Sequence, residues 1–285
     1  MYETKEITYK ENAPINFLYN TMLGRIFLNA LIRPSVSKLL GSFMDSSASK
    51  ILIKNFIKRN NIQMDEYERA DYSSFNDFFI REIKKSCRPL AHETMLFAPC
   101  DGKLTAYPIT ADSIFHIKNS KYDVENLLQD KKLADEFTGG VCLIFRLMPD
   151  DYHRYHYIDD GEILSQKAIR GVLHTTRHIS LKHYKIYLQN SREYSVMQTE
   201  KFGKIIQMEV GALFVGRITN HKTKGRFARG DEKGFFEFGG STVVMLFQKD
   251  TVKIDSAIYD NTQQNKESVV RMGQKIGECL QKPTL

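Results

Sequence analysis

Apolar residues near the N-terminus recur at the spacing of an amphipathic helix. The apolar positions in this stretch are Phe17, Leu18, Met22, Leu23, Ile26, Phe27, Leu31 and Ile32. Polar residues such as Asn16 and Arg25 fall on the other side, so residues 14–32 are predicted to form one helix. A basic, aromatic-rich helix of this kind either lies in a membrane interface or covers the core of its own domain.

Two further helices are predicted before Pro89. One runs through SKILIKNFIKRN, residues 49–60. The other begins at Ser74, because Ser74 and Asp77 form the S-x-x-D pattern of a helix cap in front of FFIREIKK. It is expected to end before Arg88-Pro89, since a residue that precedes a proline disfavours helical geometry.

After Pro89 short apolar runs alternate with Gly, Pro and Asp, which is typical of strands joined by turns. The runs are MLFAP, GKLTAYPI, GVCLIFRLMP, IIQMEVGALFVGRIT, STVVMLFQ and TVKID. A short helix is predicted in YDVENLLQ, and residues 265–280 return to a helical pattern. The fold class is therefore predicted to be α+β. A helical N-terminal region, residues 1–90, is expected to lie on a β-rich, barrel-like or sandwich-like body, residues 91–285.

Composition narrows the class of protein. The chain has 285 residues, of which 42% are hydrophobic and 26% charged, so wholesale disorder is ruled out. No apolar run is long enough to span a bilayer. The net charge of +7 suits an anionic partner, namely a membrane surface, a nucleic acid or an acidic substrate. Nucleic-acid binding is not expected, because the basic residues form no stripe interleaved with aromatic ones.

The four cysteines are far apart and form no CxxC pair. They give neither a zinc-ligand spacing nor the framework of a small secreted domain. The first residues, MYETKEITYK, are acidic and polar where a signal peptide needs a basic and then an apolar stretch. A reduced, cytoplasmic setting is therefore expected.

Two segments carry candidate acid–base residues. Asp101 lies in PCDGK between two predicted strands, where Asp-Gly is most often a turn. His153 and His156 lie in DYHRYH, directly after an apolar strand. They could share a metal, but a third ligand and an HExxH context are missing, so no metal site is expected. In a strand or loop this spacing puts the two histidines on opposite sides, which suits two separate tasks.

A third segment is Gly239-Gly240-Ser241-Thr242, directly before the apolar run VVMLF. Two glycines allow unusual backbone angles and a close approach to a carbonyl. The serine could be a nucleophile, although Gly-Gly-Ser is more often a turn, and the segment is not the GxSxG elbow of hydrolases. The chain has no GxGxxG motif and no P-loop, so it shows no motif for an external cofactor.

These segments share their order with a known family. The sequence resembles the bacterial, pyruvoyl-dependent phosphatidylserine decarboxylase proenzymes over most of its length. The shared segments are FNDFFIREIKKSCRPL, FAPCDGKL, LMPDDYHRYH, DGEI, REY, MEVGALFVGRI and FEFGGSTVVMLF. Many members have Leu-Gly-Ser-Thr where this chain has Gly-Gly-Ser-Thr, but the scissile Gly240-Ser241 pair is kept.

The resemblance implies an enzyme that activates itself. Ser241 would attack the carbonyl of Gly240 and cut the chain into residues 1–240, the beta chain, and 241–285, the alpha chain, which stay together as a heterodimer. Ser241 would become the pyruvoyl group, so no external cofactor is needed. His156 matches the family's base, which activates the serine hydroxyl. Asp101 matches the carboxylate that orients that base.

The resemblance also implies the reaction, a decarboxylation that turns phosphatidylserine into phosphatidylethanolamine and releases carbon dioxide. The pyruvoyl ketone would form a Schiff base with the lipid's serine amine and accept the electrons left behind, as pyridoxal phosphate does elsewhere. The amide carbonyl of Thr242 would share that charge. His153 matches the general acid, a role that suits histidine because its pKa lies near neutral pH.

Three other functions stay open at this point. They are a non-catalytic lipid-binding relative, a pyruvoyl decarboxylase of a soluble amino acid, and a serine hydrolase. The four intact residues Asp101, His153, His156 and Ser241 argue against the first. The amphipathic N-terminal helices favour a lipid substrate over a soluble one.

The expected location is peripheral, on the cytoplasmic face of the cell membrane. Arg25, Arg33 and Lys38 lie among the apolar residues of the N-terminal helices and suit an anionic membrane surface. A homo-oligomer is left open. Basic residues of HTTRH, residues 174–178, lie in a plausible stretch for headgroup binding, but a solvated strand end is the favoured interpretation.

Overall fold

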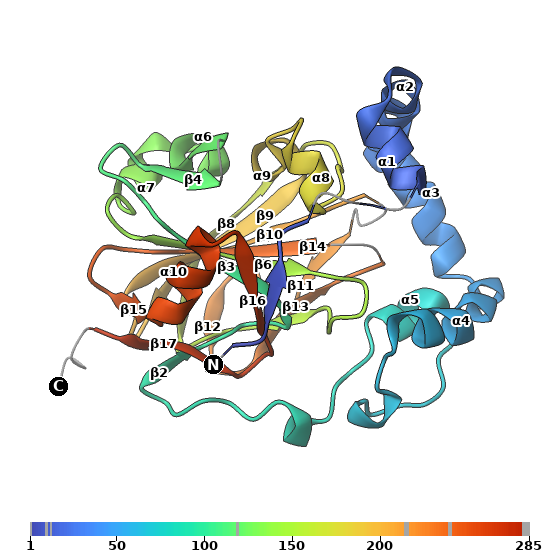
Figure 1. Ribbon diagram of the computed structural model, residues 1–285. Coiled ribbons are helices and arrows are strands. Elements are labelled where there is room, and N and C mark those ends of the chain that lie inside the picture. The colour runs from blue at the N-terminus through green and yellow to red at the C-terminus, as the bar shows by residue number, and fades with distance from the viewer. Residues whose placement is uncertain are drawn as a thin grey trace.

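The computed structural model describes residues 2–8, 11, 13–117, 120–213, 217–238 and 241–280. The helices of residues 13–60 form an N-terminal arm at one side of a β-rich body (Figure 1). This arrangement confirms the predicted α+β class. The α-helices are α1 (Ala13–Asn20), α2 (Met22–Leu31), α3 (Pro34–Met44), α4 (Ile51–Asn60), α5 (Phe75–Phe79), α6 (Val124–Leu128), α7 (Lys131–Asp135), α8 (His178–Leu181), α9 (Ile186–Gln189) and α10 (Ser256–Gln263). Single 3₁₀ turns are η1 (Ser47–Lys50), η2 (Met64–Glu66) and η3 (Lys85–Cys87).

The strands are β1 (Thr4–Glu6), β2 (Met95–Phe97), β3 (Gly102–Pro108), β4 (Ile114–Ile117), β5 (Ser120–Asp123), β6 (Val141–Leu147), β7 (Arg154–His156), β8 (Gly161–Ile169), β9 (Arg192–Thr199), β10 (Lys204–Val210), β11 (Ile218–Asn220), β12 (Gly225–Phe227), β13 (Glu232–Phe236), β14 (Ser241–Phe247), β15 (Val252–Ile254), β16 (Lys266–Val270) and β17 (Lys275–Cys279). Each apolar run named from the sequence contains at least one strand. The predicted short helix in YDVENLLQ is α6.

The N-terminal arm contains more helices than the hydrophobic pattern predicted. The helix expected over residues 14–32 is broken at Thr21, whose extended backbone and side-chain oxygen cap α2 by accepting the N–H of Gly24 at 2.9 Å. A Cβ atom at Gly24 would lie 2.0 Å from the carbonyl oxygen of Phe17, so only glycine lets α2 pack this closely on α1. The helix predicted over residues 49–60 is confirmed as η1 and α4, whereas α3 was missed although Pro34 stands at its first turn.

The third predicted helix has the expected start and the wrong end. The Ser74 hydroxyl accepts the N–H of Asp77 at 3.1 Å, as the capping pattern predicts. However, α5 stops at Phe79 because the following residues pair with an extended segment. The N–H of Lys84 donates to the carbonyl of Glu66, and the carbonyl of Glu82 accepts the N–H of Glu68, both at 2.9 Å.

The main sheet has nine strands in the order β1-β16-β3-β6-β14-β10-β9-β8-β12. One face packs on the small sheets β15-β17-β2 and β11-β13-β7, with residues such as Phe97, Tyr155 and Ile276 in the shared core. The other face is covered by α6, α7, α9 and the β4–β5 hairpin, through residues such as Leu127 and Tyr187 (Figure 1). The body is therefore sandwich-like, and the sheet does not close into a barrel within the described residues.

The helix predicted over residues 265–280 is wrong. These residues form β16, which lies between β1 and β3, and β17, which lies between β15 and β2. Gly273 sits in the turn between them with φ of 84°, a left-handed conformation that ends any helix at this point. The backbone groups of β16 pair with β3, so a sheet ladder replaces the hydrogen bonds that a helix would have made.

Candidate active site

Ser241 is the first residue of β14, the central strand of the main sheet. It stands opposite Leu147, the last residue of β6, in the antiparallel register of the two strands. Its side chain is buried, with 0% exposure, and its hydroxyl has no hydrogen-bond partner within the described part of the chain. Gly239 and Gly240, including the predicted scissile carbonyl, lie outside the described residues.

Asp101 lies at the same end of the main sheet, two strands away from β14. It directly precedes β3, which pairs with β6 on the side away from β14, with Lys103 opposite Arg146. Asp101 and Ser241 therefore flank the end of β6 from two sides. The buried carboxylate accepts two hydrogen bonds from Arg88, at 3.0 Å from Nε and 2.7 Å from Nη2, and a third from the N–H of Met272 at 2.7 Å.

His156 ends β7 and reaches the same region through its backbone. Its N–H donates to the carbonyl of Pro99 at 2.9 Å, two residues before Asp101. The ring is buried, and Nδ1 has no hydrogen-bond partner among the described residues. Burial lowers the pKa of His156 because it disfavours the imidazolium, while the charges of Glu232 and Asp101 act in the opposite direction. The ring is thus held neutral, in the form that can accept a proton.

His153 lies deeper and has different neighbours. Its Nδ1 is 2.8 Å from the carbonyl oxygen of Asp151, and because a carbonyl only accepts, Nδ1 carries the proton and Nε2 the lone pair. Nε2 is buried without a hydrogen-bond partner in the described part of the chain. Burial, assisted by the nearby Arg81 cation, lowers the pKa of His153 well below its ordinary value. The ring packs on Phe79 of α5, with ring centroids 4.0 Å apart.

The four predicted residues therefore gather around one end of the sheet, but they are not joined directly. No hydrogen bond links Asp101, His156 and Ser241 to one another within the described residues. The roles assigned to them, including that of Asp101 as the partner of His156, stay predictions. What the arrangement offers is a buried hydroxyl and two neutral imidazoles with polar atoms left unpaired, and such groups are typical of catalytic sites.

Other residues around this site were missed by the sequence analysis. Arg81 is fully buried, and its Nη2 donates to the carbonyls of Asp150 and Asp151 at 3.2 and 3.3 Å, which fixes the loop that carries His153. Arg88 holds Asp101. The available signal was an arginine inside or beside an apolar run, in FFIR and SCRPL, because a buried arginine needs acceptors.

The interpretation of HTTRH as a solvated strand end is wrong. His174 is 3% exposed and stacks on Tyr184 with ring centroids 3.9 Å apart. His178 is buried as well and begins α8. Both side chains therefore belong to the packing between α8, α1 and the main sheet.

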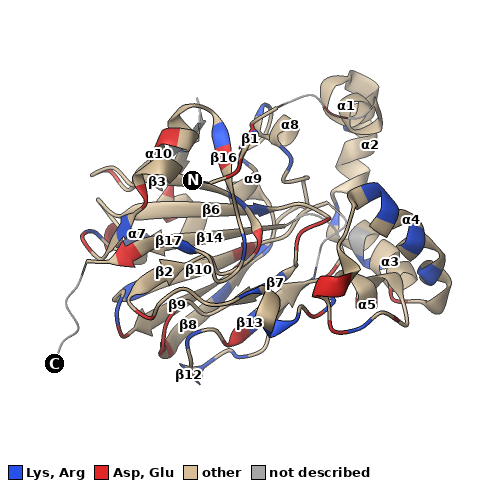
Figure 2. Cartoon of the chain, turned by 60° about the horizontal axis from the view of Figure 1, so that its bottom comes forward, with Lys and Arg blue, Asp and Glu red and all other residues tan. Residues whose placement is uncertain are grey.

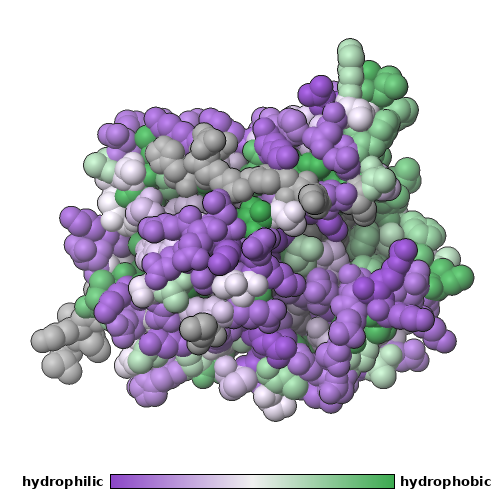
Figure 3. All heavy atoms as spheres, viewed as in Figure 1, coloured by the Kyte–Doolittle hydropathy of each residue, from purple (hydrophilic) through white to green (hydrophobic). Residues whose placement is uncertain are grey.

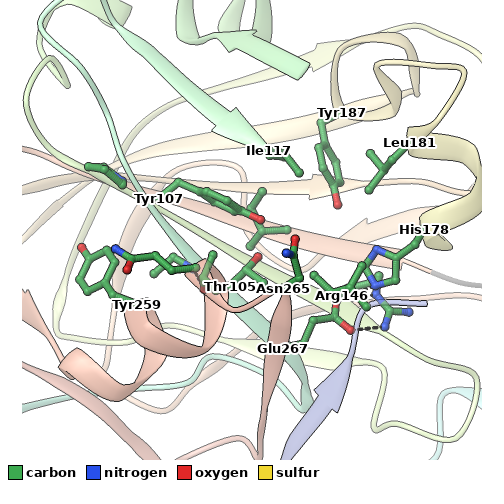
Figure 4. A pocket seen from close by; sticks show the side chains of 16 residues that line it. Thr105, Tyr107, Ile117, Arg146, His178, Leu181, Tyr187, Tyr259, Asn265 and Glu267 are labelled. Atoms are coloured by element: carbon green, nitrogen blue, oxygen red, sulfur yellow. Dashed lines mark hydrogen bonds and ion pairs between the residues drawn. The ribbon is translucent and has the colours of Figure 1, made fainter. Parts of the chain in front are cut away.

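A cavity of about 250 Å³ opens on the helix-covered face of the sheet (Figure 4). Its floor holds the ion pair of Arg146 and Glu267, whose Nε–Oε1 and Nη2–Oε2 distances are 2.8 and 2.5 Å. His178 Nε2 lies 3.2 Å from the same carboxylate. Arg146 stands opposite Thr242 in the sheet register, so the cavity lies one strand away from the candidate site. Within the described residues no group of three or more His, Cys, Asp or Glu side chains could hold a metal ion.

An enzyme is the class of protein that the α+β fold and this buried serine–histidine site suggest, and comparison with known proteins identifies the family. The family model of phosphatidylserine decarboxylase matches residues 75–278, which include all four candidate residues. The chain is 48% identical over 281 residues to phosphatidylserine decarboxylase proenzyme 2 of Clostridium acetobutylicum, covering 97% of this chain and 96% of that protein.

Two further relatives agree. The phosphatidylserine decarboxylase proenzyme of Clostridium perfringens is 41% identical over 270 residues, which is 92% of each chain. That of Ruminiclostridium cellulolyticum is 40% identical over 277 residues, 95% of this chain and 92% of its own. The chain belongs to the phosphatidylserine decarboxylase family.

Proposed function

We propose that this chain is a phosphatidylserine decarboxylase that activates itself by cleavage between Gly240 and Ser241. Family membership supports the reaction. The single structural observation that carries the proposal is the buried, unpaired hydroxyl of Ser241 at the start of β14, at the end of the main sheet where Asp101 precedes β3. A buried hydroxyl without a partner is costly, and a catalytic role is one explanation for keeping it.

Self-cleavage requires a base and a mobile proton. His156, neutral and with Nδ1 unpaired, takes the hydroxyl proton as Oγ of Ser241 attacks the carbonyl carbon of Gly240. The C–N bond then breaks, the Ser241 nitrogen takes the proton, and an ester replaces the amide. Removal of the Cα proton of Ser241 expels the Gly240 carboxylate and leaves dehydroalanine. Water then releases ammonia and leaves the pyruvoyl group at the start of the alpha chain.

The residues around Ser241 fit such a group. Ser241, Thr242, His153 and His156 all have buried side-chain polar atoms without hydrogen-bond partners in the described residues. Ser241 and Thr242 are neighbours on β14 and point to opposite faces of the sheet, so the Ser241 side fits a ketone and the backbone between the two residues supplies its amide. When formed, the pyruvoyl group supplies a carbonyl that condenses with the amine of the lipid and accepts the electrons left by carbon dioxide.

His153 is suited to carry a proton to the substrate carbon. Because Nδ1 donates to the Asp151 carbonyl, Nε2 is the atom that takes up and returns the proton. Its low pKa means that His153 starts neutral and must first receive a proton. The ammonium group of phosphatidylserine loses protons as it condenses and can supply this one. His153 then delivers that proton to the carbon that loses carbon dioxide.

We also propose that the N-terminal arm docks on an anionic membrane surface. In the described residues no helix combines the length and hydropathy needed to cross a bilayer. The exposed apolar face of α1 and α2 is formed by Phe17, Met22, Leu23, Ile26 and Phe27. Figure 3 shows that this hydrophobic surface continues along α3 and α4, where Leu39, Phe43 and Ile51 are exposed. The expectation that Leu18 belongs to the face is wrong, since it packs inward near Tyr19 and Leu28.

The charges beside this face suit anionic lipid. Arg25, Arg33 and Lys38 are exposed, and Figure 2 shows more Lys and Arg residues on α4. Docking through this arm would bring the headgroup of a bilayer lipid toward α5, which contacts His153 through Phe79. The cytoplasmic face of the cell membrane is the location that this proposal implies.

A denaturing gel, the intact masses of the purified protein and a product assay test the proposed function. We expect two fragments, residues 1–240 and 241–285, with the smaller one blocked at its N-terminus by the pyruvoyl group. The protein should release carbon dioxide from phosphatidylserine and not from free serine. A single uncut chain without this activity would favour a serine hydrolase or a non-catalytic relative, and activity on free serine would favour a decarboxylase of a soluble amino acid.

A further inference from the structure

We propose that Asn76 is a positioning residue for self-cleavage, because it holds the backbone of Phe238 so that the carbonyl of Gly240 meets the hydroxyl of Ser241. The inference rests on the proposed function. Asn76 belongs to α5, which lies far from Ser241 in the sequence. In space α5 lies beside Phe238, three residues before Ser241.

The side-chain amide of Asn76 makes three hydrogen bonds, and two of them reach the segment that precedes Ser241. Its Oδ1 accepts the N–H of Phe238 at 3.0 Å. Its Nδ2 donates to Oε2 of Glu237 at 3.2 Å and to Oδ1 of Asp45 at 2.8 Å. These bonds fix which way the amide points, because an acceptor faces the backbone N–H and a donor faces the two carboxylates. Asn76 itself is buried, so water does not replace these partners readily.

Arg217 completes this anchor. Its Nε lies 2.7 Å from Oε2 of Glu237, and its Nη1 lies 2.9 Å from Oδ2 of Asp45. Two acids, Asp45 and Glu237, therefore form a closed ring of hydrogen bonds with the amide of Asn76 and the cation of Arg217. The ring of Phe238 packs edge-on against Phe75 and Phe79, with centroids 5.0 and 5.5 Å apart, which fixes the same segment by apolar contact.

The need for such an anchor follows from the two residues that come next. Gly239 and Gly240 have no side chains by which a neighbour could hold them, and glycine has the largest backbone freedom. The Gly-Gly pair is flanked by Phe238, held by Asn76, and by Ser241, held by the β6–β14 ladder. The attack of Ser241 on the preceding carbonyl depends on alignment, and a small misplacement of reacting atoms costs up to about a hundredfold in rate.

The experiment measures cleavage directly. The full chain is made by cell-free translation, synthesis is stopped, and the uncut fraction is followed on a denaturing gel. Asn76→Ala removes all three hydrogen bonds and should slow cleavage by about ten- to hundredfold. The matched control is Asn60→Ala in α4, which also removes one side-chain hydrogen bond, to the carbonyl of Phe56, but touches no part of the cleavage segment. It should cleave at the wild-type rate.

Asn76→Asp separates positioning from a loss of folding. It keeps the acceptor for Phe238 but places a carboxylate against Asp45 and Glu237, with Arg217 as the cation in contact with both of them. When that carboxyl takes up a proton, the donor is restored. The cleavage rate of this variant relative to wild type should therefore rise as the pH is lowered from about 8 to about 5.5, since like charges raise a carboxyl pKa. Thermal melts of each variant in the uncleavable Ser241→Ala background report folding.

The outcomes separate the inference from the proposed function. Slow cleavage of Asn76→Ala in a folded precursor, with recovery of Asn76→Asp at low pH, supports the inference. If Asn76→Ala does not fold, the Asn76→Asp ratio decides, and a ratio that does not change with pH overturns it. Wild-type rates in both Asn76 variants overturn the inference alone. A wild-type chain that stays whole overturns self-cleavage, and the role of Asn76 with it.

Discussion

Arg88 and Asp101 form a buried, two-pronged ion pair, with Nε 3.0 Å from Oδ1 and Nη2 2.7 Å from Oδ2. The N–H of Met272 occupies Oδ1 as well, so the carboxylate is fixed from three directions. The remaining Nη1 of Arg88 bonds Glu66 at 3.0 Å. The position of the Asp101 carboxylate is therefore fixed. Its removal should affect the stability of the precursor as well as the rate of cleavage.

Asp101→Asn should slow cleavage less than loss of His156, because Asp101 orients the base and transfers no proton. It should also destabilise the precursor by about 3 kcal/mol, since the buried Arg88 loses the better buried of its two carboxylate partners and keeps Glu66. Denaturant unfolding in the Ser241→Ala background measures the second effect. The control is Asp101→Asn combined with Arg88→Met, which removes both charges. If cleavage recovers in this double variant along with stability, then Asp101 has no orienting role.

The two histidines should fail in different ways. His156→Ala should block cleavage because Ser241 loses its base, and the protein should stay one chain on a denaturing gel. His153→Ala should still cleave, at least partly, but decarboxylate poorly per pyruvoyl group, because its unpaired Nε2 has the later task of carrying a proton to the substrate. Normal cleavage in both variants would contradict these roles, and a need for His153 alone would reverse them.

The sequence was sufficient for the elements whose signals are local. The apolar runs after Pro89 form strands, and Ser74 caps a helix. Both were predictable because hydrophobic alternation and helix capping depend on residues only a few positions apart. The length of α5 was not predictable in this way, since Glu82 and Lys84 pair with Glu68 and Glu66 on the other side of the helix in the sequence. For the same reason residues 265–280 looked helical until β3 and β2 were seen to pair with them.

The candidate site shows the same limit. Asp101, His153, His156 and Ser241 were found because they lie in motifs of a known family. Their supports could not be found, because Arg88, Arg81 and Asn76 gain their meaning only from partners brought to them by the fold. A buried arginine or asparagine carries no local pattern, and its role is decided by which carbonyl or carboxylate it meets.

Stability should fall in mild acid, and His174 should account for part of the loss. Burial lowers the pKa of His174 from 6.5 to about 4. Between these values the unfolded chain binds a proton that the folded chain does not, so stability is complete above about pH 6.5 and is lost as the pH falls. At pH 5 the loss from this residue is about 2 kcal/mol. Unfolding of the Ser241→Ala precursor at pH 7 and 5 measures it.

The comparison is between the pH slopes of two variants. His174→Gln should lose less stability between pH 7 and 5 than its parent, whatever its stability at pH 7. His92→Gln, at an exposed position, should keep the parent's slope. An unchanged slope in His174→Gln would show that His174 takes up its proton equally well in the folded and unfolded chains.

Membrane docking should depend on the outward face of the N-terminal arm. Phe17 and Phe27 are 43% and 61% exposed, while Tyr19 and Leu28 on the inward side pack against Ile179 of the body. Phe17→Glu with Phe27→Glu should therefore leave the fold intact and weaken binding to anionic vesicles in a co-sedimentation assay. Activity on bilayer phosphatidylserine should fall, while activity on a water-soluble short-chain analogue survives.

Salt and a control substitution complete this test. Each basic residue near the surface contributes about 1 kcal/mol, which is screened within a Debye length, so wild-type binding should weaken with salt without vanishing because the apolar face remains. Leu164→Glu changes an apolar residue on β8 that is 52% exposed and should leave vesicle binding as it was. If the double variant unfolds or loses both activities together, the helices serve the body's own core, and unchanged vesicle binding in a folded double variant would exclude this face as the docking surface.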